Sequence, residues 1–269
     1  MKNQILEQKE QYGLKKIGAT AIATKLIPKI HNVSDIFMRE QLLEGARRSI
    51  LSGYEDRHHV LSGHFDNPRC SPVRFTIYKQ NGKYRIVVWV INVFEYYEEV
   101  VGRIESRLNE YLKQFYNADK CFIYKQKQNE YNFGLTKEKR CYNIHSFFPF
   151  NQDNYEIYLY NINNYEKKEA KERNKQLIKK CIISNIYGMG KGVDEGGYID
   201  YDFKNKGKII VDIYDDFKFK TRPYKEGFKD CKLIFIRKLI ILTNVLLPIC
   251  FGIGRKTAAG YGRIKEEIL

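Results

Sequence analysis

The chain has 269 residues, 43% of them hydrophobic, which is enough apolar material for one large globular domain or two domains of ordinary size. Lys and Arg number 47 against 32 Asp and Glu, so the formal net charge is +15 and a polyanion is the expected partner, with nucleic acid ahead of an anionic membrane surface. An A/T-rich genome would also raise the lysine count, but it would not by itself leave the acids so far behind. The six cysteines contain no C-x-x-C pair and no short Cys/His spacing, which excludes a zinc site of the finger type and favours reduced thiols.

The N-terminal segment 1–16 carries charges and amides where a cleavable signal would need an apolar stretch, so a cytoplasmic protein is expected. The most apolar run covers 233–251, and Arg237, Lys238 and Asn244 fall inside it. We therefore expect this run to be a helix buried in the protein, with no membrane partner.

The first half of the chain predicts the order β-α-β-β-α-β, which is the ferredoxin-like unit. Its second and third strands are separated by Asn81-Gly82, the strongest short-range signal for a hairpin. In its second helix, apolar residues recur at three- and four-residue steps and form one stripe. The expected elements are a strand over 17–27, a helix over 35–51 capped by Ser34, a hairpin over 73–93, a helix over 96–116 and a strand over 120–126.

The second half predicts the same order again. Together the two halves give an α+β protein with two ferredoxin-like (RRM-like) domains at 1–127 and 155–269, joined by an irregular linker at 128–154, and with a glycine-rich loop before the C-terminal strand. The expected elements are a strand over 155–162, a helix over 165–188 ending at Gly188, a hairpin over 197–219 turning near 205–207, the buried helix over 233–251 and a strand over 261–264.

The segment "FGIGRKTAAGYGRI" (Phe251 to Ile264) holds the candidate binding residues. Its spacing fits neither a P-loop nor a dinucleotide fingerprint. Glycines let a backbone approach a phosphate chain closely, two arginines and a lysine add charge, a threonine adds a hydroxyl donor, and a tyrosine ring can stack on an unpaired base. The candidate RNA-binding residues are Gly252, Gly254, Arg255, Lys256, Thr257, Gly260, Tyr261, Gly262 and Arg263.

The competing interpretation of this segment is that its glycines only let the last strand pack tightly against the element before it. For Tyr261 we weigh packing in the core and stacking on RNA equally. For Arg255 and Lys256 we favour RNA, because a packing loop has no need of adjacent cations. No metal site and no cofactor are expected.

The pattern Gly-Ile-Gly-x-Lys-Thr-x-x-Gly-Tyr-Gly-Arg, which begins at Gly252, resembles the C-terminal glycine-rich loop of the RAMP superfamily of CRISPR-associated proteins. It looks most like the sixth Cmr-type, Cas7-like subunit of type III effector complexes. The resemblance implies a non-catalytic subunit that helps to hold crRNA, or other single-stranded RNA, beside further Cas7-like subunits in antiviral defence.

The alternative within the superfamily is the metal-independent endoribonuclease that processes CRISPR repeat RNA. In that interpretation His31, just before the Ser34 cap, is the catalytic residue, because a histidine titrates near neutral pH. Three further histidines, His58, His59 and His64, lie beside Asp66 and suggest metal binding, but they fit an RNA-contacting loop at least as well, since adjacent side chains of an extended segment point to opposite sides. A basic ribosome- or tRNA-associated protein is a third possibility.

Overall fold

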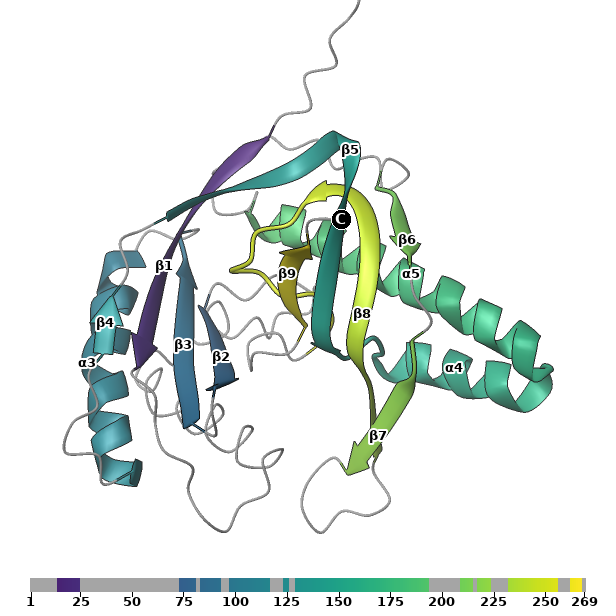
Figure 1. Cartoon of the computed structure of the whole chain (residues 1–269), viewed down its shortest axis with the longest axis horizontal. Coiled ribbons are helices and arrows are strands. Elements are labelled where there is room, and N and C mark those ends of the chain that lie inside the picture. Colours follow the sequence, from purple (N-terminus) through teal and green to yellow (C-terminus); the bar gives the residue numbers. More distant parts are fainter. Residues whose placement is uncertain are drawn as a thin grey trace, which may run out of the picture.

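The computed structural model describes residues 14–24, 73–80, 83–92, 97–116, 123–125, 129–193, 209–214, 217–223, 232–255 and 262–267. These parts form a mixed α/β structure around one large antiparallel sheet of nine strands, with helices at both ends of the molecule (Figure 1). In chain order the elements are β1 (Lys15–Thr24), β2 (Val73–Gln80), β3 (Lys83–Ile91), α3 (Tyr97–Tyr116), β4 (Ile123–Lys125), β5 (Asn129–Phe147), α4 (Gln152–Asn164), α5 (Lys167–Val193), β6 (Val211–Ile213), β7 (Phe219–Pro223), β8 (Lys232–Leu246) and β9 (Arg263–Glu267).

The first four strands of the chain lie side by side in the order β4-β1-β3-β2. Alternation along β2 and β3 sends Phe75 and Val88 to one face, and both are fully buried. α3 packs on this side of β1 and β3, and its buried stripe includes Val101, Ile104 and Leu108. The strand over 17–27, the hairpin strands, the amphipathic helix and the short strand are thus confirmed, whereas the helix expected over 35–51 lies outside the described residues.

The expectation of an irregular stretch at 128–154 is wrong over most of its length, because β5 is a strand of 19 residues. Its first part, Asn129 to Phe133, pairs with β1, and its later part pairs with β8 on one side and β9 on the other. Residues 141–144 are buried without alternation because neighbours on both sides place them in the middle of the sheet. The two-domain boundaries remain a prediction, since β5 joins the strands of both halves into one sheet.

The strand expected over 155–162 is also wrong, because this segment lies within α4. Asn151 caps the helix: its side-chain oxygen accepts a hydrogen bond from the Asn154 amide at 3.0 Å. Tyr158 and Asn161, three residues apart, form the buried face, and Asn161 Nδ2 donates to Asn174 Oδ1 of α5 at 2.8 Å. The helix expected over 165–188 is confirmed as α5, although it continues past Gly188 to Val193.

The buried helix expected over 233–251 is instead β8, the central strand of the second half. Its residues pair with β5 along one edge and with β6 and β7 along the other. The glycine-rich segment therefore follows a strand, not a helix. The hairpin expected over 197–219 is wrong in its described part, because β6 and β7 both pair with β8, while 197–208 lie outside the described residues.

In the second half β5 and β8 lie centrally, with β9 beside β5 and with both β6 and β7 beside β8. If β6 and β7 are taken together as one edge, each half has its first and third strands at the centre and its second and fourth at the edges. This is the strand arrangement of the split β-α-β unit. α5 packs on the sheet through Ile178, Ile182 and Ile186, which belong to the same core cluster as Ile144 and Ile241. No described helix has both the length and the apolar character needed to cross a membrane.

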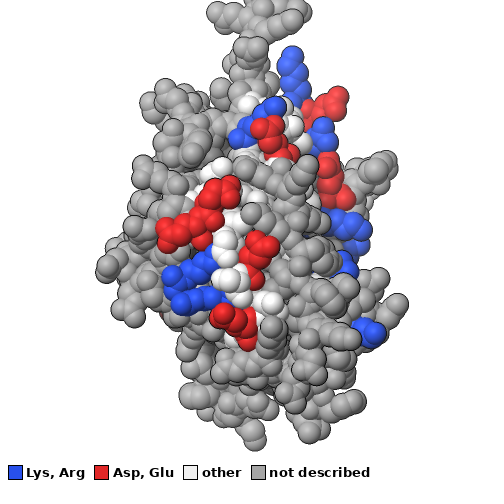
Figure 2. Space-filling view, turned by 90° about the vertical axis from the view of Figure 1, so that its left-hand side faces the viewer, with Lys and Arg blue, Asp and Glu red and all other residues white. Residues whose placement is uncertain are grey.

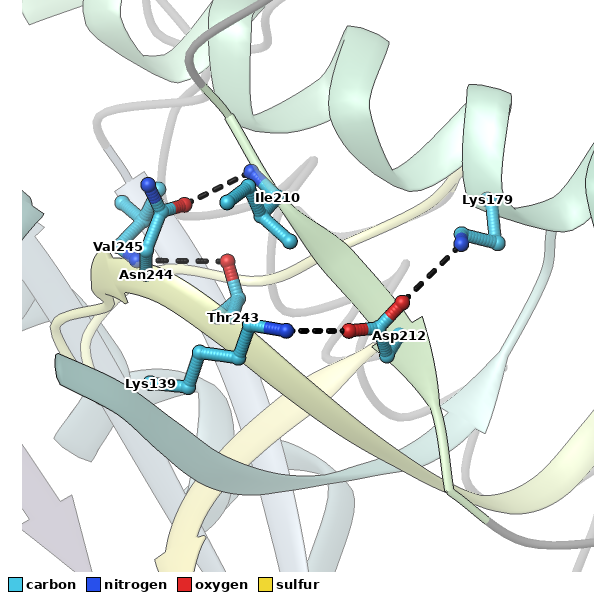
Figure 3. A network of polar contacts seen from close by, with 7 residues as sticks. All are labelled: Lys139, Lys179, Ile210, Asp212, Thr243, Asn244 and Val245. Atoms are coloured by element: carbon cyan, nitrogen blue, oxygen red, sulfur yellow. Dashed lines mark hydrogen bonds and ion pairs between the residues drawn. The ribbon is translucent and has the colours of Figure 1, made fainter.

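Side chains attach the three-residue edge strand β6 to its neighbours (Figure 3). Asp212 accepts hydrogen bonds from Lys139 of β5 at 2.7 Å and from Lys179 of α5 at 3.2 Å. Next to β6, the Ile210 amide donates to Asn244 Oδ1 at 2.7 Å. These contacts supplement the few ladder hydrogen bonds that such a short strand can make.

Candidate nucleic-acid interface

The glycine-rich segment starts as a buried limb that leaves β8 and ends as a second limb that enters β9. In the first limb, Cys250, Phe251 and Ile253 are fully buried. The Phe251 ring meets Phe133 of β5 edge to face, with ring centroids 5.6 Å apart. The first limb is therefore part of the hydrophobic core and not a surface loop.

The two limbs are hydrogen-bonded to each other. Gly252 and Arg263 form an isolated antiparallel bridge, and the Ile253 amide donates to the Gly262 carbonyl at 2.9 Å. The first limb thus pairs with the start of β9 in the manner of one more short strand at that edge of the sheet. This fixes both ends of the intervening residues 256–261, which lie outside the described part.

Three further amides of the limbs donate to acceptors elsewhere in the protein. Amides that are already hydrogen-bonded within the protein are not available to hold a phosphate in the manner of a P-loop. The described limbs therefore serve as a support, and their side chains, not these amides, are the groups left to contact a ligand. The donors and acceptors are Gly254 to Asn185 Oδ1 (3.0 Å), Arg255 to the Phe148 carbonyl (2.9 Å) and Gly262 to the Ser146 carbonyl (3.1 Å).

Two glycines of the limbs have backbone conformations that other residues rarely adopt. Gly254 has φ +99° and Gly262 has φ +63°. A Cβ atom on Gly254 would lie 2.7 Å from the Phe148 carbonyl oxygen, and one on Gly262 would lie 1.7 Å from the Ile253 carbonyl oxygen. At both positions the glycine allows close packing within the protein.

The edge strand β2 contacts both limbs. Arg74 is 2% exposed, and its Nη1 donates to the Phe251 carbonyl of the first limb. Tyr78, four residues along the same face of β2, lies under Arg263 of the second limb, with the guanidinium carbon 4.5 Å from the ring centroid. A strand of the first half of the chain therefore holds the base of the candidate loop.

The candidate residues divide into three groups. Gly252, Gly254 and Gly262 make the contacts above, while Arg255 is exposed and Arg263 is half-buried. Sequence reasoning missed Arg74, Tyr78 and Asn185. The signal available for β2 was that its arginine and its tyrosine, four residues apart, lie on the same face of the strand. Outside the described residues lie Lys256, Thr257, Gly260 and Tyr261, together with His31, His58, His59 and His64.

The solvent face of α3 differs from the surface expected for RNA. Figure 2 shows the side of the molecule that carries this helix, where basic and acidic side chains are interspersed. Its described charged residues are Glu98, Glu99, Arg103, Glu105, Arg107 and Glu110. Among these described side chains the acids outnumber the bases, so they do not form a basic patch for a polyanion. The described residues also contain no group of three His, Cys, Asp or Glu side chains placed to hold a metal ion.

No family model matches the sequence. An uncharacterized protein of Methanocaldococcus jannaschii is 28% identical over 134 residues, which is 49% of this chain and 76% of that protein. Among solved structures, a crystal structure of Cas6b matches with a TM-score of 0.60 at 18% identity. A second one, described as the CRISPR RNA processing endoribonuclease Cas6b, matches with a TM-score of 0.56 at 17% identity. Both matches cover 94% of this chain and 100% of the other. The chain has the fold of these proteins. A type IV Cas6 crRNA endonuclease, Csf5, matches with a TM-score of 0.53 at 11% identity, over 93% of this chain and all of its own (100%).

Proposed function

We propose that the chain binds CRISPR repeat RNA and processes it as a metal-independent endoribonuclease. The observation that carries this proposal is the likeness of the fold to Cas6b across 94% of the chain. The net charge of +15 agrees with an RNA ligand, as does the exposed arginine on a loop base that the protein holds rigidly.

The glycine-rich segment supports the RNA side of this proposal through its charges. Arg255 is exposed just where the first limb ends, and the next residues include Lys256. The hydrogen bonds of Gly254 and Arg255 amides to Asn185 and Phe148 fix the backbone beneath the Arg255 side chain. An anchored cation loses less freedom on contacting a phosphate than one on an unrestrained loop, which favours binding.

A second candidate function is the non-catalytic, crRNA-holding subunit of a type III complex, with other Cas7-like subunits as partners. It is favoured by the pattern from Gly252 to Arg263, which resembles the sixth Cmr-type subunit. The two functions share the RNA ligand and differ in whether the chain cuts it.

Incubation of the purified chain with repeat RNA from its own CRISPR locus, in the presence of a chelator, tests both functions. The endoribonuclease should cut this RNA at one position, and His31→Ala should bind it without cutting. Binding without cleavage by the wild-type protein would favour the type III subunit. Equal affinity for repeat RNA and for unrelated tRNA, without cleavage, would contradict both functions and favour a general RNA-binding protein.

A further inference from the structure

Three basic side chains lie in one row across the strands β9, β5 and β8. The antiparallel register pairs His145 of β5 with Arg263 of β9 on one side and with Lys238 of β8 on the other. Residues directly opposite each other in antiparallel strands project from the same face of the sheet, with Cβ atoms about 4.5–5.5 Å apart. The sequence alone gave no sign of this row, because its members come from three distant segments.

The next row on the same face adds another cation. There Asn143 of β5 lies between Lys265 of β9 and Ile240 of β8. The two rows together hold two lysines, one arginine and one histidine, and no Asp or Glu. Lys238 and Lys265 are exposed, and His145 and Arg263 are half-buried, so the basic groups reach solvent.

This face is the opposite one from the face that α5 covers. The intervening residues Ile144, Leu239 and Ile264, which alternate with the basic row, belong to the core cluster that includes Ile182 of α5. The basic rows therefore lie on the other side of the sheet, where the stacking of Arg263 on Tyr78 brings β2 against the same edge.

The register therefore places two cationic side chains, Lys238 and Arg263, on either side of an imidazole. All three side chains carry N–H groups that donate hydrogen bonds to anions. The guanidinium carbon of Arg263 lies 4.5 Å from the centroid of the Tyr78 ring, a cation–π contact that restrains this side chain beside the row.

We infer that the row Lys238–His145–Arg263 is a phosphodiester-binding site, separate from Arg255 of the glycine-rich segment. Adjacent strands are spaced by about 4.8 Å, so the row extends over about 10 Å, enough to follow a stretch of RNA backbone. Ammonium, guanidinium and imidazole N–H groups all donate to phosphate oxygens. That the phosphodiester belongs to CRISPR repeat RNA rests on the proposed function; the site itself rests on the register.

The test compares Lys238→Gln and His145→Leu with a matched control, Lys180→Gln, which removes an exposed lysine from α5 on the other side of the sheet. Two fluorescent RNAs are used with each full-length variant, the repeat RNA and oligouridine, and binding is measured over a range of KCl concentrations. We expect Lys238→Gln to bind both RNAs about tenfold more weakly and to lower the salt slope by about 0.7, the value for one phosphate contact on a single strand.

Loss of affinity must occur without loss of the fold. Because Lys238 is exposed and glutamine keeps a long polar side chain there, the melting temperature of Lys238→Gln should stay close to that of the wild type, while Lys180→Gln should change neither affinity nor slope. Wild-type affinity and slope in both row variants would overturn the site. Equal binding of repeat RNA and oligouridine by the wild type, with weakened row variants, would support the site and contradict the CRISPR ligand. Failure of the wild type to bind either RNA would overturn both.

Discussion

The contact between Arg74 and the first limb predicts that two substitutions should be strongly non-additive. Arg74→Met removes the guanidinium that donates to the buried Phe251 carbonyl. Gly252→Ala places a Cβ atom 2.7 Å from the Arg74 guanidinium carbon, so the guanidinium must move away from the same carbonyl. Each substitution therefore breaks the same hydrogen bond by a different route.

The expected size follows from the type of bond. A hydrogen bond to a charged group contributes about 1.5–3 kcal/mol, so each single variant should lose about that much unfolding free energy. For a chain of this size such a loss lowers the melting temperature by about 4–10 °C. In the double variant the bond is already absent and the flexible methionine can yield to the new methyl group, so its loss should be close to that of Arg74→Met alone.

Urea and thermal unfolding of the four proteins measure this cycle. Gly102→Ala is the matched control, because a Cβ atom at this exposed α3 position meets nothing within 4 Å. It should stabilise the protein by about 0.5–1 kcal/mol, as a helical Gly to Ala change does. If the losses of Arg74→Met and Gly252→Ala simply add, or if Gly252→Ala melts like the wild type, the guanidinium does not connect β2 to the limb as described.

The remaining predictions concern the second limb, the β6 network and a buried thiol. Gly262→Ala should cost about 1–3 kcal/mol or prevent folding, since φ is +63° and Ile253 occupies the space of the new methyl group; wild-type melting would contradict this. Hydrogen bonds from Lys139 and then Lys179 lower the pKa of Asp212, so its ion pairs stabilise the fold above its ordinary pKa and stop doing so as the pH falls through the folded value. At pH 7, Asp212→Asn should thus be less stable than the wild type, by under about 1 kcal/mol because the ion pairs are half-exposed. In strong acid the two proteins should be equally stable, and a stability difference that is the same at both pH values would refute the ionic role. Burial raises the pKa of Cys181 to about 11, so peptide mapping should find it alkylated only after unfolding, and rapid labelling of the folded protein would be the contrary result.

The sequence predicted elements well where one face of an element is polar. The hairpin of β2 and β3 was predicted from Asn81-Gly82 between two runs of β-branched and aromatic residues. The helix α3 was predicted from its three-to-four-residue period, which is clear because one face of the helix is exposed to solvent. The sequence of β8 lacked such a period: burial alternates along residues 239–246, but the less buried positions are mostly apolar too. A continuous apolar run looks the same for a strand and for a buried helix. The β-branched Ile236, Ile240 and Ile241 were the signal that favoured a strand.

The errors at α4 and β5 have different physical causes. In α4 the alternation of tyrosine and aliphatic residues suggested a strand, but the Asn151 cap and the contact of Asn161 with α5 stabilise a helix. β5 is long and crosses both halves, which short-range patterns cannot show. The candidate residues of the glycine-rich segment were found from composition, whereas the roles of Arg74 and Tyr78 depend on tertiary contacts far apart in the sequence.

The position of β5 has a consequence for the order in which the molecule can be assembled. β1 can pair with β5 only after Asn129 to Phe133 have been synthesised. The middle of β5 can pair with β9 only after β9, much later in the chain, has also been synthesised. During synthesis, the Cys141 to His145 edge of β5 is an unpaired strand edge for as long as residues 263–267 remain inside the ribosome. In native-state hydrogen exchange, we expect the amides of this segment to exchange only when the whole sheet opens. Amides of the first and second halves should then exchange with the same free energy, as one cooperative unit.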